Sequence, residues 1–253
     1  MQRYLSLRVQ TALYLSVFFL GLHHVFVYFT NASIMKEYFH LDIYTILGLY
    51  GVSSIFGICV YLLLFKTKQK HTKNRIYIAT IIEFICLGLM YVTTITDNSV
   101  WLYITAFIIH HTITPYILFN LDKLFEDYTH IQDRGRGRGI YLTMWNTPFI
   151  VVPIMLSALS TETLALTYSI AFCLLIPFVI LIHSYIQNPV DESEPEPKLI
   201  SITEKIKIFW SDTLDRKAFI TQACLHLYYG STGILLPIYL HEYFGFEWDH
   251  IGA

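Results

Sequence analysis

The sequence predicts an all-α membrane protein whose chain crosses the bilayer several times. Of its 253 residues, 55% are hydrophobic and only 14% are charged, whereas soluble domains carry about 25% charged residues. A helix needs about 20 consecutive, largely apolar residues to cross the hydrocarbon core, and seven segments of the chain meet that requirement. This composition excludes an ordinary water-soluble enzyme, collagen, a coiled coil and a disordered chain.

The seven predicted spans form a group of six and a separate seventh. The first span is too long for the apolar core of a signal peptide and lacks a cleavage site of small residues, so we expect it to be retained. The spans are residues 9–29, 43–65, 76–95, 100–121, 140–159, 164–186 and 218–240.

Polar segments between the apolar runs set the boundaries of the spans. Residues 30–42 contain Lys36 and Glu37, and residues 66–75 are strongly basic. Residues 97–99 and 160–163 are short outer turns without Lys or Arg, whereas residues 122–139 contain Lys123 and three arginines. The four cysteines lie singly in different spans and read as small buried side chains, with no disulfide or zinc pattern.

Lysine and arginine predict how the spans are oriented. Positive loops stay on the cytoplasmic side of a membrane, and with a cytoplasmic N-terminus every Lys and Arg except Lys36 falls on that side. We therefore expect a multi-pass protein of the cell membrane (inner or plasma membrane) with its N-terminus in the cytoplasm. This orientation is opposite to that of a seven-helix receptor. The glycosylation sequon at Asn31 directly follows a span and has little weight.

A break in composition separates the sixth span from the seventh. Residues 188–197 are acidic and rich in proline, which is typical of a linker. Residues 199–214 have apolar residues at helical spacing with charges between them, which predicts a helix on the membrane surface. We expect three parts: a six-helix bundle (1–187), a cytoplasmic linker (188–217), and the first transmembrane helix of a further unit (218–253).

A short repeat relates the two transmembrane parts. Glu37-Tyr38-Phe39 and Glu242-Tyr243-Phe244 occupy the same place relative to the first and seventh spans. We interpret this as a parallel repeat of about six helices. The chain is then expected to be an incomplete copy of a longer protein, lacking most of its C-terminal half.

The chain resembles the major facilitator superfamily of transporters over its whole length. The resemblance rests on the six-helix unit, the linker with a surface helix, the Arg-Gly-containing residues 133–143 before the fifth span, and the exit from the seventh span at 240–252. It implies a secondary transporter that moves a small solute by alternating access, with proton coupling as an open option. Residues 62–70 lack the Asp and Gly of the family's motif, which keeps a non-transporting receptor or scaffold as the alternative.

Glu83 is the only Asp, Glu, Lys or Arg inside any predicted span. It lies roughly 10 Å from the start of its span at 1.5 Å per residue. An ionisable group at such depth is costly and therefore marks a functional site by default. We predict a proton or cation carrier, with a structural pairing to a neighbouring helix as the equally weighted alternative.

Histidines and other polar side chains gather in the first, fourth and seventh spans. In the resembled family these spans line the central cavity, so the resemblance implies a solute-binding role for them; for any one residue, an interhelical hydrogen bond is the stronger alternative. Histidine-rich boxes at one membrane face are absent, so we expect neither a metal centre nor a cofactor nor an enzyme. The candidate cavity-lining residues are His23, His24, Tyr28, His110, His111, Thr114, Asn120, His226 and Tyr229.

Alternating arginines and glycines precede the fifth span and carboxylates surround them. We predict an inter-helix latch that breaks and reforms during transport, with glycines that let the backbone turn tightly. Nucleotide-binding patterns are absent, and we expect the lipid bilayer, a small solute and protons as partners but no nucleic acid. The candidate gate residues are Asp122, Glu126, Asp127, Asp133, Arg134, Gly135, Arg136, Gly137, Arg138 and Gly139.

Overall fold

A computed structural model describes most of the predicted six-helix region. It covers residues 2–64, 72–96, 99–129, 133–156, 165–186 and 238–246, with single residues 210, 211, 213, 216, 217, 220, 221, 224 and 236. Only the backbone is described for 2–6 and 61–64. No strand occurs within these ranges.

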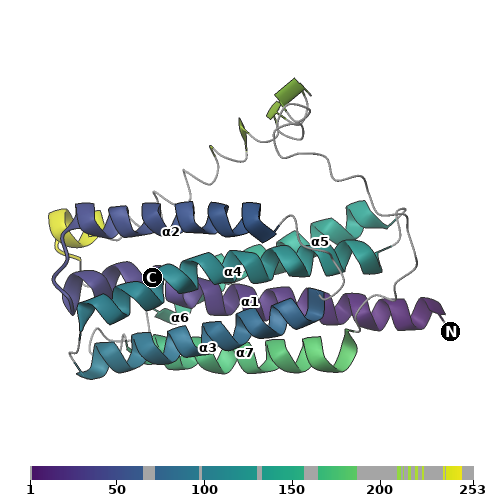
Figure 1. Ribbon diagram of the computed structural model, residues 1–253, viewed down its shortest axis with the longest axis horizontal. Helices are drawn as coiled ribbons and strands as arrows, with labels where there is room; N and C mark the ends of the chain where they lie inside the picture. Colours follow the sequence, from purple (N-terminus) through teal and green to yellow (C-terminus); the bar gives the residue numbers. More distant parts are fainter. Residues whose placement is uncertain are drawn as a thin grey trace. The chain divides into compact units, whose positions relative to one another are not determined.

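Seven α-helices provide six stretches that are long and apolar enough to cross a membrane, among the residues described. The coarse prediction of an all-α, multi-pass membrane protein is confirmed. The helices are α1 (Gln2–Glu37), α2 (Ile43–Leu64), α3 (Thr72–Thr96), α4 (Val100–Tyr128), α5 (Arg134–Asn146), α6 (Pro148–Leu156) and α7 (Leu166–Tyr185), shown in Figure 1.

The chain divides into two compact units, and α1 to α7 all belong to the first. The second unit is Val190–Gly245, and its described residues up to 244 are helical. Most of the predicted linker, with most of its surface helix, and most of the seventh span lie outside the described residues. His226 and Tyr229 lie outside them as well.

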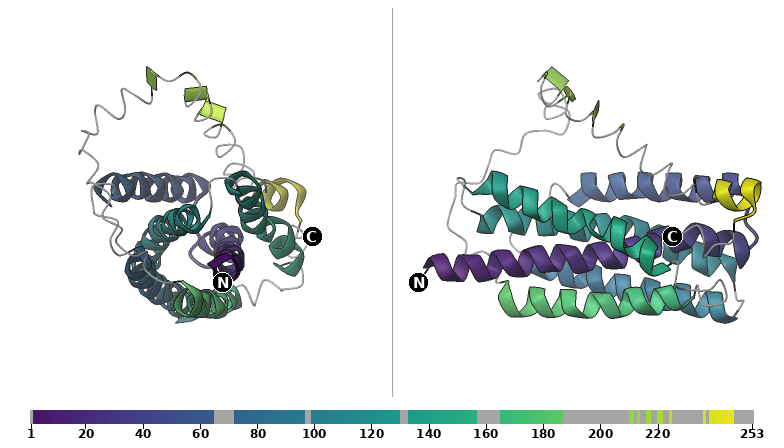
Figure 2. Two further views of the ribbon diagram at one scale, coloured as in Figure 1. Left: turned by 90° about the vertical axis from the view of Figure 1, so that its right-hand side faces the viewer. Right: turned by 180° about the vertical axis from the view of Figure 1, so that it is seen from behind.

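Helix α1 occupies the middle of the first unit. It packs against α7, α5, α6, α4 and α2, and the end-on view of Figure 2 shows it enclosed by other helices. Helix α3 packs against α4 and α7, and α2 packs mainly against α4. Because α1 is the most buried of the six spans, its polar side chains can meet partners from several helices.

The outer faces of the helices are apolar. Large hydrophobic side chains such as Ile58 on α2, Ile81 on α3 and Ile180 on α7 are more than half exposed. A contiguous apolar surface of this kind is unfavourable in water but suits lipid. The buried polar side chains of the bundle include His23 on α1, Glu83 on α3 and His110 on α4.

The connection between α4 and α5 is shorter than predicted. Helix α4 continues to Tyr128 instead of ending at residue 121, and α5 begins at Arg134 instead of residue 140. The predicted tight turn at the glycines is wrong, because residues 134–139 are helical and none of their glycines has a positive φ. The Asp133 carbonyl accepts the Gly137 N–H at 2.9 Å and so begins the helix.

Gly137 allows close packing between helices and does not form a backbone turn. A Cβ atom there would lie 3.0 Å from Cζ of Phe125 on α4 and 3.2 Å from the hydroxyl of Tyr14 on α1. Hydrogen in place of a side chain therefore lets α5 approach α4 and α1 closely.

The predicted fifth span, 140–159, is two helices joined at Thr147. Pro148 begins α6, and because proline has no N–H it cannot continue the hydrogen-bond ladder of α5. Gly21 of α1 faces this junction: a Cβ there would lie 3.0 Å from Cγ of Pro148 and 3.2 Å from the carbonyl oxygen of Trp145. Residues 157–159 lie outside the described part.

Asp42 caps the first turn of α2, outside the membrane-spanning segment. Its carboxylate accepts the Thr45 hydroxyl at 2.6 Å and the Thr45 backbone N–H at 3.0 Å. These hydrogen bonds, led by the one from the hydroxyl, lower the pKa of the Asp42 carboxyl. The cap thus defines where the second span begins.

We predict that Gly21→Ala destabilises the protein whereas Gly88→Ala does not. The new methyl group at Gly21 would press on the Pro148 ring and a backbone carbonyl, and overpacking of this kind costs about 1–3 kcal/mol; at Gly88 nothing lies within 4 Å of a Cβ. The measurement is the thermal unfolding temperature of each variant in detergent. Equal unfolding temperatures would contradict the close approach of α1 to the α5–α6 junction.

Candidate functional site

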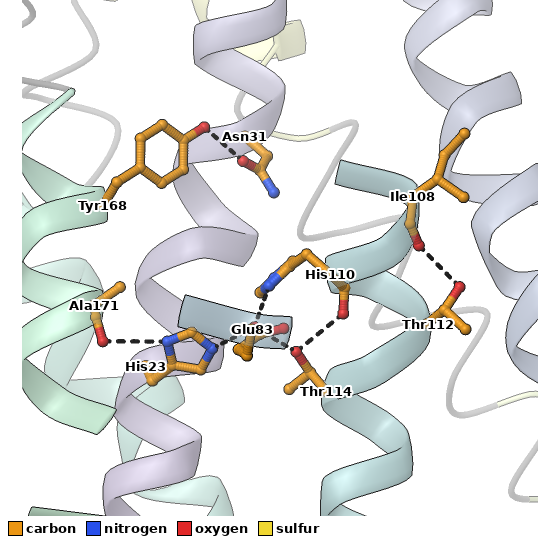
Figure 3. A network of polar contacts seen from close by, with 9 residues as sticks. All are labelled: His23, Asn31, Glu83, Ile108, His110, Thr112, Thr114, Tyr168 and Ala171. Atoms are coloured by element: carbon orange, nitrogen blue, oxygen red, sulfur yellow. Dashed lines mark hydrogen bonds and ion pairs between the residues drawn. The ribbon is translucent and has the colours of Figure 1, made fainter. Parts of the chain in front are cut away.

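Glu83 lies at the centre of a fully buried polar cluster, drawn in Figure 3. One carboxylate oxygen, Oε1, is 2.7 Å from Nε2 of His23 and 3.0 Å from the hydroxyl of Thr114. The same oxygen contacts Nδ1 of His110. Three polar side chains therefore converge on a single oxygen atom.

Four helices bring these groups together. Glu83 comes from α3, His23 from α1, and both His110 and Thr114 from α4. Helix α7 contributes a backbone group, because Nδ1 of His23 lies 3.2 Å from the carbonyl oxygen of Ala171. The cluster thus ties the central helix to three neighbours, and its side chains are closed off from the outside of the bundle.

The contact with Ala171 determines where His23 carries its hydrogen. A carbonyl oxygen only accepts hydrogen bonds, so Nδ1 must be the donor. A neutral His23 then has a bare Nε2, and its 2.7 Å contact with Glu83 requires a proton on the glutamate; otherwise, His23 is an imidazolium. In either case one proton lies between Nε2 and Oε1.

The Thr114 hydroxyl lies near two hydrogen-bond acceptors. Its hydroxyl is 3.0 Å from Oε1 of Glu83 and 3.1 Å from the backbone carbonyl of His110. A hydroxyl has one hydrogen, so it donates to only one of these acceptors at a time. The cluster can therefore redistribute its hydrogen bonds when a proton or another cation arrives or leaves.

Several buried atoms around Glu83 make no hydrogen bond with the described residues. They are Oε2 of Glu83, Nε2 of His110, Nδ1 of His24 and Nε2 of His111. Buried polar atoms in proteins are nearly always paired, and exceptions call for an explanation. The rings of His24 and His111 lie 6.4 and 5.2 Å from that of His110, centre to centre, so all four histidines belong to one region.

Aromatic rings surround the two outer histidines of this region. His24 stacks on Trp145 with ring centres 5.6 Å apart, and His111 lies 4.9 Å from Tyr50 and 4.4 Å from Phe107. Sequence reasoning missed these aromatic partners, because single aromatic residues within an apolar span look like any lipid-facing or core residue.

Most of the described cavity-lining candidates gather around Glu83, and one does not. His23, His110 and Thr114 contact Glu83 directly, and His24, His111 and Tyr28 lie beside them. Asn120 is buried but donates to the Tyr116 carbonyl of its own helix at 2.8 Å. That bond makes Asn120 part of α4 itself and not of the cluster.

A second buried network lies between α1, α4 and α7. Oδ1 of Asn31 accepts the Tyr168 hydroxyl at 2.8 Å and the Tyr103 hydroxyl at 3.1 Å, and the two hydroxyls are 2.7 Å apart. Asn31 is fully buried inside α1. The sequon therefore falls on a structural side chain that no glycan can reach in this fold.

Two of the gate candidates form an ion pair. Arg138 of α5 donates to Asp122 of α4 at 3.0 Å, with both side chains about one-third exposed (39% and 30%). Arg134 points instead to the backbone carbonyls of Glu126 and Thr129 at 3.5 Å. The other gate candidates, Glu126, Asp127, Asp133 and Arg136, are exposed and form no ion pair among the described residues.

No protein-family model, curated protein or solved structure matches the chain.

We predict that Tyr168→Phe lowers the stability of the protein by about 1 kcal/mol, because Asn31 loses the shorter of its two hydrogen bonds. Tyr185→Phe, an exposed position on the same helix, is the matched control and should leave stability unchanged. Thermal unfolding in detergent measures both. A Tyr168 variant as stable as the control would show that this network does not hold α7 to α1.

Proposed function

We propose that the protein is a secondary transporter of the major facilitator type that moves a small solute by alternating access. The observation that carries the proposal is the Glu83 cluster, a carboxylate enclosed by histidines where α1, α3, α4 and α7 meet. The six spans would form one half of the transporter, and a second bundle would complete the solute pathway.

Physical chemistry supports a coupling role for Glu83. An ionised carboxylate is poorly solvated among apolar helices, so it needs a cation or a proton as partner. Binding or losing that cation changes which hydrogen bonds from His23, His110 and Thr114 are formed. A change of charge at Glu83 is thereby converted into a change in the attraction between α1, α3 and α4.

The gate and the orientation belong to the same proposal. The strong asymmetry of basic residues supports a cytoplasmic N-terminus in the cell membrane, which would put the Arg138–Asp122 pair on the cytoplasmic side. This pair joins the C-terminal part of α4 to the N-terminal part of α5 and would open and reform as the two halves rock. His24, Tyr28 and His111 would face the solute.

The alternative is a receptor or scaffold that has the transporter fold without transport. It is favoured by one sequence feature, the missing Asp and Gly in residues 62–70. The two functions differ in whether a solute accumulates across the membrane.

We expect Glu83→Gln to abolish the dependence of solute uptake on pH, because the amide keeps the shape of the side chain but binds no proton. Uptake is measured in vesicles that contain the complete transporter, over a range of external pH. Glu37→Gln, an exposed glutamate near the end of α1, is the control and should behave as the parent protein. Unchanged pH-dependent uptake in the Glu83 variant would remove the carrier role.

We expect Asp122→Asn and Arg138→Gln each to slow uptake, because either change removes the ion pair between α4 and α5. The exchanged double variant, Asp122→Arg with Arg138→Asp, should recover part of the rate, since it restores opposite charges. Glu126→Gln, an exposed change on the same helix, serves as the control. Failure of the exchange to recover any activity, with normal protein levels, would argue against a latch.

A further inference from the structure

We propose that His23, Glu83 and His110 form a binding site for one divalent transition-metal ion, with Zn²⁺ as the test ion. One ligand atom from each residue lies within 4.8 Å of the others, and all three side chains are fully buried. A transition-metal ion would be the cation of the Glu83 site. Coupling of this ion to a solute rests on the proposed transport, whereas binding of the ion does not.

The chemistry of the three ligands selects the ion. Two imidazole nitrogens and one carboxylate are a frequent ligand set for Zn²⁺ with an open fourth position, and for other first-row transition metals. Mg²⁺ and Ca²⁺ prefer oxygen ligands throughout, and sulfur ligands are absent from this set. The site therefore favours a transition metal over the common hard cations.

His23 has the outer contact that metal-binding histidines show. Such histidines nearly always donate their second ring N–H to a carbonyl or a carboxylate, which fixes the tautomer and the direction of the ring. Nδ1 of His23 does this with the Ala171 carbonyl at 3.2 Å, as Figure 3 shows. Its Nε2 atom is left facing Glu83 as a metal ligand.

Glu83 offers a second, independent pointer to a ligand. Its Oε2 atom is buried and has no hydrogen-bond partner among the described residues, although hydrocarbon provides nothing to pair with it. A metal ion bound to both carboxylate oxygens would satisfy this atom. Thr114, 3.0 Å from Oε1, or a bound solute would complete the coordination.

The distances describe a protonated form of the same site. Nε2 of His23 and Oε1 of Glu83 are 2.7 Å apart, a hydrogen-bond distance. Ligand atoms around tetrahedral Zn²⁺, at bond lengths of about 2.0–2.1 Å, lie about 3.3 Å from one another. The ion would take the place of the shared proton and open this contact by a fraction of an ångström.

The test is direct binding of Zn²⁺ to the purified full chain in detergent, without a histidine tag, in competition with a fluorescent chelator. We expect one Zn²⁺ per chain, with affinity reduced at least 10-fold in Glu83→Gln and in His110→Gln. His183→Gln is the matched control, because His183 is an exposed histidine on α7 beside Tyr77 and lies apart from the cluster. Its affinity should equal that of the parent chain.

X-ray absorption of the Zn²⁺-loaded parent chain keeps the test valid if a variant fails to fold. The expected spectrum has nitrogen and oxygen neighbours at about 2.0–2.1 Å with two imidazoles. The binding test overturns the proposal if the parent chain binds no Zn²⁺ at micromolar concentration, or if folded Glu83 and His110 variants bind Zn²⁺ as well as the control does. The absorption spectrum overturns it if it shows sulfur ligands or a single imidazole. Zn²⁺ binding by the chain, combined with no solute uptake by vesicles that contain the complete transporter, would refute the proposed function while leaving the metal site in place.

Discussion

A carboxylate buried among apolar helices has no bulk water to solvate it, so it depends on the few polar groups or cations that reach it. Glu83 meets this constraint by drawing a histidine from α1 and a histidine and a threonine from α4 onto one oxygen atom. Through His23 the constraint extends to the backbone of α7. The apolar contacts of the bundle are non-directional, so these polar contacts add a directional constraint on how the four helices are aligned.

The sequence was sufficient to predict the first six spans, because a 20-residue apolar run has few alternatives. It was also sufficient to single out Glu83, since one charge among apolar residues stands out without any structure. The helix ends were harder to predict. Four of residues 122–128 are charged, yet α4 continues through them, because backbone hydrogen bonds and the packing of Leu124 and Phe125 outweigh the polarity of their neighbours.

The partners of Glu83 could be predicted only in part. His23 and His110 are 60 and 27 residues from Glu83 in the sequence, so no local spacing indicates that they contact it. Only their place in the first and fourth spans makes them candidates for the site. The contribution of Ala171 was beyond prediction, because a backbone carbonyl has no residue-type signature. Asn120 was selected by the same reasoning as Thr114, but its short side chain is satisfied by its own helix.

The hydrogen bond from His23 to Ala171 also has a thermodynamic consequence. Because of this bond, binding of a proton or metal ion at Nε2 of His23 depends on the position of α7 relative to α1. A ligand, lipid or partner that changes the free energy of this arrangement of α7 through this bond also changes the affinity of the Glu83 site by the corresponding factor. The linkage is reciprocal, so filling the site changes the position of α7. If the Glu83 site binds a cation as proposed, helix α7 would respond to the occupancy of that site as well as enclose the bundle.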